Sequence, residues 1–186
     1  TEITADEIVA LNADAVICAT GVRPATLPIP GFELAMNAKE VLDGKETGEQ
    51  VVIIGGGSVG IETAEYLAAA GKKVTVIEML DTIAEKMVNV TRFIVLGHLK
   101  GYGVNLLTSC TCQEIKENSI IYRDKDGNVL EIPADSVVIA VGDKPNTTLY
   151  DELNGRVPEL YNVGDSASAG LIATAVNQAY NCALKL

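Results

Sequence analysis

Basic residues and long apolar runs are scarce in this chain of 186 residues. Its 14 lysines and arginines stand against 25 aspartates and glutamates, which leaves a net charge of −11. Because the phosphates of nucleic acids need a basic face, this balance argues against a nucleic-acid partner. The longest apolar runs fall far short of a membrane span, and the polar N-terminal segment has no signal-peptide pattern. The sequence therefore predicts a globular, cytoplasmic protein with neither a nucleic-acid nor a membrane partner.

Cysteine and histidine are also few, and their spacing indicates no reactive site. The four cysteines stand at positions 18, 110, 112 and 182, and none forms Cys-x-x-Cys, so neither a redox dithiol nor a zinc site is predicted. Cys110 and Cys112 alternate on an expected strand, where free cysteine is ordinarily a buried packing residue. His98, the only histidine, lies on an expected helix and favours a surface or packing role. We expect no metal site and no catalytic residue, and a reducing compartment suits these cysteines.

The sequence does contain a glycine-rich turn, Gly55-Gly56-Gly57-Ser58-Val59-Gly60, between an apolar strand and a helix-like run. Val51–Ile54 precedes the turn, and a second apolar strand, Val74–Ile77, follows the helix-like run. This is the dinucleotide-binding fingerprint in its strand–helix–strand setting. The alternative is a glycine-rich turn that binds nothing.

Each position of the fingerprint has a physical role. Gly55 permits the tight turn, Gly57 lets a pyrophosphate approach the backbone, and Gly60 lets the helix pack closely on the strand. The free amides at the start of the helix, at Ser58 and Val59, face the phosphates together with the positive end of the helix dipole. These residues are therefore the candidate phosphate-binding site.

Glu78 ends the second strand, where a carboxylate can accept hydrogen bonds from an adenosine ribose. A 2′-phosphate beside it would meet like charge, and Met79-Leu80 supply no arginine to pair with that phosphate. Lys72 and Lys73 lie before the strand, at the wrong end. The sequence therefore predicts NADH rather than NADPH.

The rest of the chain predicts further strands and helices around this unit. Thr4 and Glu7 form a capping box at the start of a short helix. Three short alternating runs, two of them joined by the hairpin turn Asp124–Asn128, predict a small antiparallel meander. The expected helices are 90–100 and 171–184, the further strands 14–20, 104–108, 135–141 and 160–163, and the meander runs 111–116, 119–123 and 129–132.

One sequence pattern occurs twice and indicates how the chain is divided. Asp14–Thr26 and Asp135–Thr147 are both apolar strands that end in a glycine turn followed by proline. They bracket the fingerprint, which indicates a nucleotide-binding domain of residues 46–140 inserted into a domain of residues 1–31 and 143–186. The alternative is a coincidence of two buried strands, because strand–Gly–Pro patterns recur in α/β proteins. Pro24, Pro28, Pro30 and Gly31 predict a linker.

Four segments of the chain stand in a recognisable order. They are Ala19-Thr20-Gly21, the Gly55–Gly60 fingerprint with Glu62 and Glu78, Ala140-Val141-Gly142 with Pro145-Asn146, and Val163-Gly164-Asp165. In this order the chain resembles the pyridine-nucleotide-dependent flavin oxidoreductases in which a nicotinamide domain interrupts a flavin adenine dinucleotide domain. It looks most like the C-terminal region of the NADH:flavin oxidoreductases of the 2,4-dienoyl-CoA reductase, 2-enoate reductase and trimethylamine dehydrogenase type.

The resemblance implies an α/β fold: a Rossmann-like three-layer NAD(H)-binding domain with a small antiparallel meander, inserted in a partial FAD-binding domain. It places Glu62, in the first turn of the helix, near the nicotinamide. It assigns FAD to Thr20, Gly21, Gly142, Gly164 and Asp165, with Asp165 accepting hydrogen bonds from the ribityl chain. The alternatives are that Glu62 is a carboxylate stabilised near a helix N-terminus and that Asp165 is a turn residue.

Parts of the resembling architecture are missing. The first strand–helix–strand of the flavin domain, the barrel and the iron–sulfur cysteines are absent, and Ser166 and Ala169-Gly170 replace a cysteine and a basic residue of several relatives. The chain also begins at Thr1 rather than Met. We therefore expect a fragment whose FAD belongs to the full-length protein and whose partners are the missing flavin and barrel domains.

No nucleophile or acid–base pair is evident, which agrees with hydride transfer, since there the cofactors carry the chemistry. The expected function is an electron-entry module that binds NADH and passes hydride to FAD. One alternative is a non-catalytic module that binds an adenine nucleotide. Another is a simple alcohol or hydroxy-acid dehydrogenase, which would need a Tyr-Lys pair or a histidine base in a substrate region that the sequence lacks.

Overall fold

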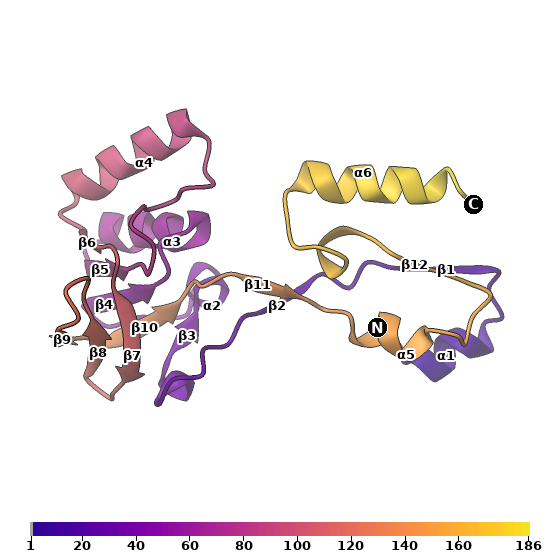
Figure 1. Cartoon of the computed structure of the whole chain (residues 1–186), viewed down its shortest axis with the longest axis horizontal. Coiled ribbons are helices and arrows are strands. Elements are labelled where there is room, and N and C mark those ends of the chain that lie inside the picture. The colour runs from indigo at the N-terminus through magenta and orange to yellow at the C-terminus, as the bar shows by residue number, and fades with distance from the viewer. Residues whose placement is uncertain (1) are drawn as a thin grey trace. The chain divides into compact units, whose positions relative to one another are not determined.

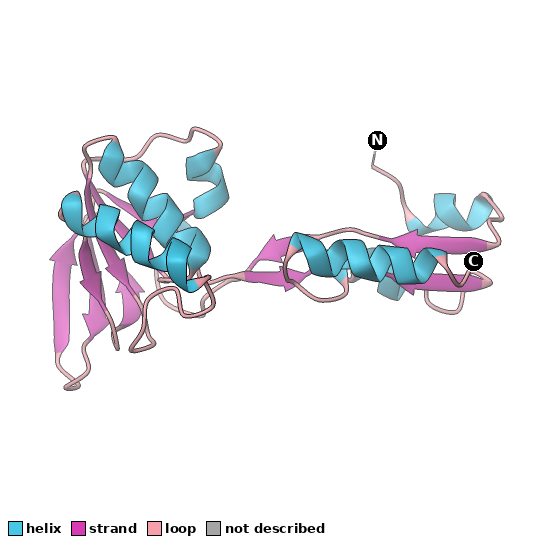
Figure 2. Ribbon diagram, turned by 90° about the horizontal axis from the view of Figure 1, so that it is seen from above, coloured by secondary structure: helices cyan, strands magenta, loops and turns pink. Residues whose placement is uncertain are grey.

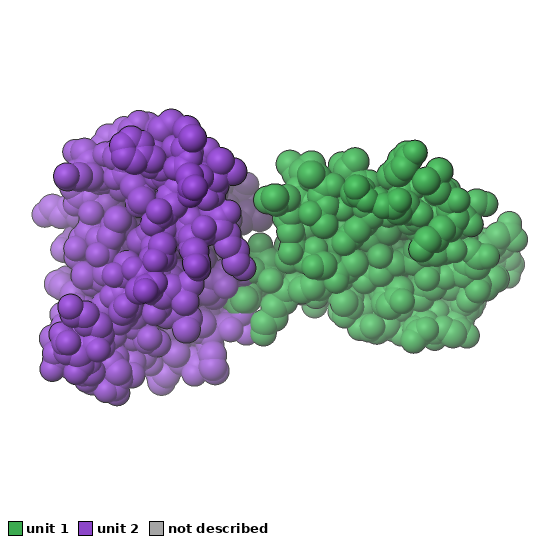
Figure 3. All heavy atoms as spheres, turned by 45° about the horizontal axis from the view of Figure 1, so that its top comes forward, with its two compact units in different colours: residues 1–25, 143–186 green, residues 26–142 purple. Residues whose placement is uncertain are grey.

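The computed structural model describes residues 2–186, and the chain divides into two compact units (Figure 3). The first unit combines Thr1–Ala25 with Asp143–Leu186, and the second is Thr26–Gly142. In the order of the chain, the second unit is therefore an insertion within the first.

The second unit contains a parallel sheet with helices and a separate antiparallel sheet (Figure 1). Its elements are β3 (Met36–Asn37), α2 (Ala38–Leu42), β4 (Gln50–Ile54), α3 (Ser58–Ala69), β5 (Lys73–Ile77), α4 (Asn89–Gly101), β6 (Asn105–Leu107), β7 (Thr111–Ile115), β8 (Ser119–Arg123), β9 (Val129–Pro133) and β10 (Ser136–Ile139). The parallel sheet has the order β3-β10-β4-β5-β6, and β7, β8 and β9 form the antiparallel sheet. The expected Rossmann-like α/β fold with a small antiparallel meander is confirmed.

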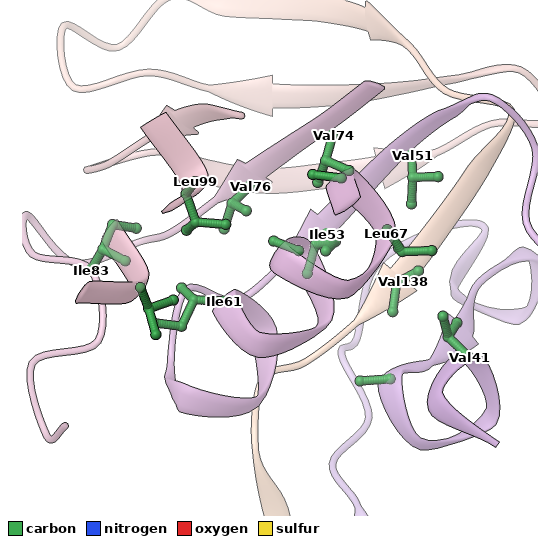
Figure 4. Close-up of a cluster of buried hydrophobic side chains, with 14 of the residues drawn as sticks. Val41, Val51, Ile53, Ile61, Leu67, Val74, Val76, Ile83, Leu99 and Val138 are labelled. Atoms are coloured by element: carbon green, nitrogen blue, oxygen red, sulfur yellow. The ribbon is translucent and has the colours of Figure 1, made fainter. Parts of the chain in front are cut away.

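The parallel sheet is buried on both faces because its strands contribute alternately to two apolar cores. Val51 and Ile53 of β4 pack with side chains of α2, α3 and α4 (Figure 4). Val52 and Ile54 of the same strand belong to the core shared with the antiparallel sheet. A parallel sheet covered on both faces needs continuously apolar strands, which explains the run at positions 51–54. The unit therefore has three layers.

The proline-rich segment before β3 is packed rather than free. The sequence predicts a linker over Pro24–Gly31, but Leu27 and Ile29 pack against the core beneath the antiparallel sheet. The amide of Ile115 in β7 also donates a hydrogen bond to the carbonyl oxygen of Pro30 at 2.9 Å. These contacts place residues 26–31 in the second unit.

The first unit combines short strands and helices from both ends of the chain (Figure 2). Its elements are α1 (Ala5–Ala10), β1 (Ala15–Cys18), β2 (Val22–Pro24), β11 (Asp143–Pro145), α5 (Thr148–Leu153), β12 (Glu159–Asn162) and α6 (Ile172–Ala183). β1 pairs with β12 in parallel, and β2 pairs with β11 antiparallel. The predicted capping box of α1 is confirmed, since Thr4 and Glu7 each bond the backbone amide of the other. No helix in residues 2–186 is both long and apolar enough to cross a lipid bilayer.

The first unit leaves much apolar surface uncovered. β1 and β12 form a sheet of only two strands. Parallel strands ordinarily belong to larger sheets whose two faces are both covered. α6 contains no charged residue, and Cys182 is its only buried side chain. Ile172, Val176 and Tyr180 of this helix are 85%, 63% and 64% exposed. These three side chains are spaced four residues apart and lie on one apolar stripe of the helix, and such a stripe ordinarily packs against other polypeptide.

A candidate dinucleotide-binding site

The glycine-rich turn joins the end of β4 to the start of α3, and two of its glycines are required by close packing. Gly55 has a φ of +108°, and a Cβ added there would lie 2.4 Å from the carbonyl oxygen of Ala140. A Cβ added to Gly60 would lie 1.9 Å from the carbonyl oxygen of Gly55. These two glycines therefore let the helix, the turn and the neighbouring strand approach one another.

Gly57 differs from these two glycines because the fold does not require it. Its φ of −71° is open to any residue, and an added Cβ would meet no atom within 4 Å. Gly57 is also exposed. A glycine here leaves open the space into which a side chain would project. That space is where the fingerprint brings a pyrophosphate close to the backbone.

The N-terminus of α3 offers hydrogen-bond donors beside this space. Gly57 is the N-cap residue, and no side chain caps the helix. The amides of Ser58, Val59 and Gly60 lie in the first turn, where the helix itself provides no acceptors. Ser58 and Val59 are exposed. Free amides at the positive end of a helix dipole bind anions, so this region fits the pyrophosphate of a dinucleotide.

Glu62 lies farther along α3 than the sequence indicates. The helix starts at Ser58, so its first turn holds no acidic residue and Glu62 falls in the second turn. The expected placement of Glu62 in the first turn is therefore wrong. Its side chain is exposed, which leaves it accessible to a ligand.

Glu78 follows β5 and is held beside the glycine-rich turn. Its Oε2 accepts a hydrogen bond from the amide of Gly56 at 2.6 Å, and its Oε1 accepts one from the amide of Leu80 at 2.8 Å. The residue is 8% exposed. Each carboxylate oxygen has more than one acceptor site, so a ribose hydroxyl can still bond to it. Met79, the next residue, is 70% exposed and brings no positive charge to this position.

In the first unit, Thr20-Gly21 and Gly164-Asp165 follow two paired strands. β1 and β12 run parallel, so their carboxyl ends meet at one edge, where the amide of Val163 donates a hydrogen bond to the carbonyl oxygen of Cys18 at 2.9 Å. Ligands of α/β sheets bind beyond the carboxyl ends of the strands. The structure thus brings together these four candidate flavin residues. The remaining one, Gly142, ends the second unit with a φ of +91°.

Hydrogen bonds hold the turn after β12 to the last helix. The amide of Gly164 donates to Oε1 of Gln178 in α6 at 2.7 Å. Oδ1 of Asp165 accepts a hydrogen bond from the amide of Gly170 at 3.1 Å. Asp165 thus has the turn role considered as its alternative, and it retains acceptor capacity for a ligand. The sequence did not single out Gln178, because nothing local marks its contact with Gly164.

Asn146, which follows β11, forms hydrogen bonds with the turn after β1. Its backbone amide donates to the carbonyl oxygen of Gly21 at 2.9 Å, and its side-chain nitrogen donates to that of Thr20 at 3.3 Å. Oδ1 of Asn146 is buried and has no partner among the described residues. A second glycine fingerprint is absent from the sequence.

The cysteines and the histidine have packing or surface positions. All four cysteines are free and buried, and burial raises the pKa of the thiols of Cys18, Cys110 and Cys112. Such thiols are poor nucleophiles because little thiolate forms. His98 is exposed and its Nδ1 bonds to Glu65 of α3. Within residues 2–186 no group of three or more histidine, cysteine or acidic side chains is arranged to bind a metal ion.

Comparison with known proteins agrees with the fold. Residues 2–179 match the pyridine nucleotide-disulphide oxidoreductases. The chain is 36% identical to an NADH oxidase of Thermoanaerobacter brockii and 34% identical to a metal reductase of Desulforamulus reducens, with 98% and 91% of the chain aligned. It spans only 29% and 30% of the lengths of these relatives.

A solved structure of 2-naphthoyl-CoA reductase matches the whole chain with a TM-score of 0.92 and 30% sequence identity, and this chain covers 29% of that protein. Fold and sequence similarity thus agree over nearly all of the residues. The chain belongs to the pyridine nucleotide-disulphide oxidoreductase family.

Proposed function

We propose that the chain is the electron-entry part of a larger flavin-dependent oxidoreductase, in which it binds NADH and positions it for hydride transfer to FAD. The observation that carries the proposal is the open space at Gly57 beside the uncapped N-terminus of α3. The NADH oxidase and the reductases among its relatives support the same chemistry. When bound, a reduced nicotinamide supplies a hydride and a flavin accepts it.

In this proposal the second unit is the NADH-binding domain. The backbone of Gly55–Gly60 binds the pyrophosphate, Glu78 accepts hydrogen bonds from the adenosine ribose, and exposed Glu62 lies toward the nicotinamide. NADH is preferred to NADPH because Glu78 would repel a 2′-phosphate and Met79 cannot pair with it. The chain's own contribution is binding and orientation, since its described residues present no activated nucleophile.

The first unit is the FAD-binding part in this proposal. Thr20, Gly21, Gly164 and Asp165 contact the flavin dinucleotide, and Gly142 leads the chain back toward them along the sequence. The exposed face of α6 and the two-stranded sheet are completed by polypeptide of the larger protein, which the 29% coverage of 2-naphthoyl-CoA reductase supports. FAD is therefore held by the full-length protein rather than by this chain alone.

Calorimetric titration of the purified chain with NADH, NADPH and ADP tests the proposal. We expect NADH to bind more tightly than NADPH because of Glu78, and more tightly than ADP because it also offers a nicotinamide. Equal affinities for ADP and NADH would favour the alternative, a non-catalytic module that binds adenine nucleotides. Binding of none of the three would contradict both functions.

Absorbance of the same preparation tests the assignment of the first unit. The chain lacks the phosphate-binding strand–helix–strand of a complete flavin site, so we expect a colourless or nearly colourless protein. Flavin absorbance at roughly stoichiometric level would show that the first unit is a complete site and would overturn this part of the proposal.

A further inference from the structure

Gly56 lies between the first two glycines of the fingerprint, and both its amide and its carbonyl oxygen form hydrogen bonds with the segment that follows β5. Its amide donates to Oε2 of Glu78 at 2.6 Å, and its carbonyl oxygen accepts a hydrogen bond from the amide of Ala84 at 2.7 Å. A Cβ added to Gly56 would lie 2.6 Å from Cδ1 of Ile83 and 3.0 Å from Cβ of Glu78. Residues 78–84 therefore lie directly against the turn that would receive the phosphates.

Ala84 adopts a backbone conformation that is unfavourable for alanine. Its φ is +50°, in the left-handed region, where the Cβ of an L-residue approaches the following carbonyl oxygen. The residue is nevertheless 2% exposed, and its amide points to Gly56. Such a conformation persists only where the surroundings hold it, so it indicates a constrained contact.

Neighbouring contacts hold Ala84 in this conformation. Ile83 is 5% exposed and belongs to the same buried cluster as Ile61 and Leu99 (Figure 4). The Nε of Arg92 in α4 donates a hydrogen bond to the carbonyl oxygen of Ile83 at 2.7 Å. The segment is therefore anchored by the apolar packing of Ile83 and by a hydrogen bond from α4, a helix that lies far from Gly56 along the sequence.

We propose that residues 78–84 form a strap that holds Gly56, and with it the glycine-rich turn, in the conformation that binds phosphate. Ala84 acts through its backbone amide and Arg92 acts through Ile83, so both are positioning residues. This inference rests on the proposed function for its ligand, NADH, but the strap itself is a property of the nucleotide-free chain.

Three variants separate the parts of the strap. Ala84→Pro removes the amide and cannot adopt the positive φ. Ala84→Gly retains the amide and favours the positive φ, so it tests whether the amide rather than the methyl group carries the role. Arg92→Ala removes the anchor without changing the strap, and Lys100→Ala, an exposed cation on the same helix with no ion pair among the described residues, is its matched control.

Two readouts are needed: the Kd for NADH, and hydrogen exchange of the Gly56 amide in the chain without nucleotide. Ala84→Pro should raise the Kd about tenfold or more, as expected for loss of a buried hydrogen bond, and should accelerate exchange of that amide by a similar factor. Arg92→Ala should raise the Kd for NADH and the exchange rate of the Gly56 amide by about threefold or more. In Lys100→Ala and Ala84→Gly both quantities should stay within about twofold of wild type.

The two readouts keep the strap and the proposed function apart. If the wild-type chain fails to bind NADH, the proposed function fails, while exchange of the Gly56 amide still decides on the strap. If Ala84→Pro does not fold, Arg92→Ala decides. Unchanged exchange and unchanged Kd in Arg92→Ala would overturn the strap, as would an Ala84→Gly variant as defective as Ala84→Pro.

Discussion

Glu78 accepts a hydrogen bond from the amide of Gly56 across 2.6 Å, so the carboxylate expected to bind the ribose also orders the turn expected to bind the phosphates. Its second oxygen accepts from the amide of Leu80. Removing the carboxylate would leave two backbone donors near it without their acceptor. Replacement of Glu78 therefore tests two roles at once, and nucleotide preference is better tested at its neighbour.

Met79→Arg should shift nucleotide preference toward NADPH while Glu78 keeps its hydrogen bonds. Met79 is 70% exposed, so an arginine fits without repacking. Its guanidinium would pair with a 2′-phosphate and offset the charge of Glu78, which should improve the Kd for NADPH by about tenfold, or roughly 1.4 kcal/mol. Titration with both nucleotides measures this, with Met79→Gln as the uncharged control. An equal gain in the glutamine variant would refute the charge argument. Adding Glu78→Ala should raise the preference further but cost affinity for both nucleotides.

Alanine at Gly60 should lower the stability of the fold, whereas alanine at Gly57 should weaken NADH binding and leave the stability nearly unchanged. Gly60→Ala places a Cβ 1.9 Å from the carbonyl oxygen of Gly55, so we expect a loss of about 1–3 kcal/mol in the free energy of unfolding. Gly57→Ala meets no atom, so its stability should stay within about 1 kcal/mol of wild type. The Kd for NADH in Gly57→Ala should nevertheless rise about tenfold or more, because the methyl group occupies the phosphate space. Urea unfolding and calorimetry measure both properties. Normal NADH binding by Gly57→Ala would place the phosphates elsewhere.

The first unit should open more readily than the second. Ala15–Cys18 belongs to a two-stranded sheet, whereas Val51–Ile54 lies within a sheet of five strands and is buried on both faces. Regions with few buried contacts exchange through low-energy local openings. Hydrogen exchange of the free chain should therefore show faster exchange in β1 and β12 than in β4. Equal protection of these strands would mean that the first unit is complete by itself.

The buried thiols should react slowly and should destabilise the fold only at alkaline pH. Burial raises the pKa of Cys18, Cys110 and Cys112, so the folded chain holds these protons more tightly than the unfolded chain does. Their stabilising contribution is present below the unfolded thiol pKa of about 8.5 and is lost as pH rises through the raised folded values. Labelling with a thiol reagent should be slow in buffer and complete in urea. Rapid labelling of the native chain at neutral pH would contradict this burial.

Some structural features lay beyond prediction because they depend on residues distant in sequence. The two strand–Gly–Pro segments were recognised as similar, but the pairing of Arg23 with Lys144 in β2 and β11 follows only from the folded chain. The sequence does not predict α5, since a helix of six residues with no side-chain cap leaves little periodicity. The proline-rich segment has the sequence of a linker because its hydrogen bond with Ile115 has no local signature.

Consecutive residues were sufficient to identify the nucleotide-binding unit. One strand–helix–strand contains the apolar run Val51–Ile54 and the glycines at 55, 57 and 60, and the carboxylate at 78 follows it directly, so the roles proposed for these residues rest on local geometry. Tertiary structure alone decided how that site is supported. The amide of Ala84 donates a hydrogen bond to the carbonyl oxygen of Gly56, and Nε of Arg92 donates one to the carbonyl oxygen of Ile83. Each of these hydrogen bonds is accepted by a backbone carbonyl oxygen, which every residue carries, so the accepting residue has no mark in the sequence and only the packing of the folded chain brings the partners together.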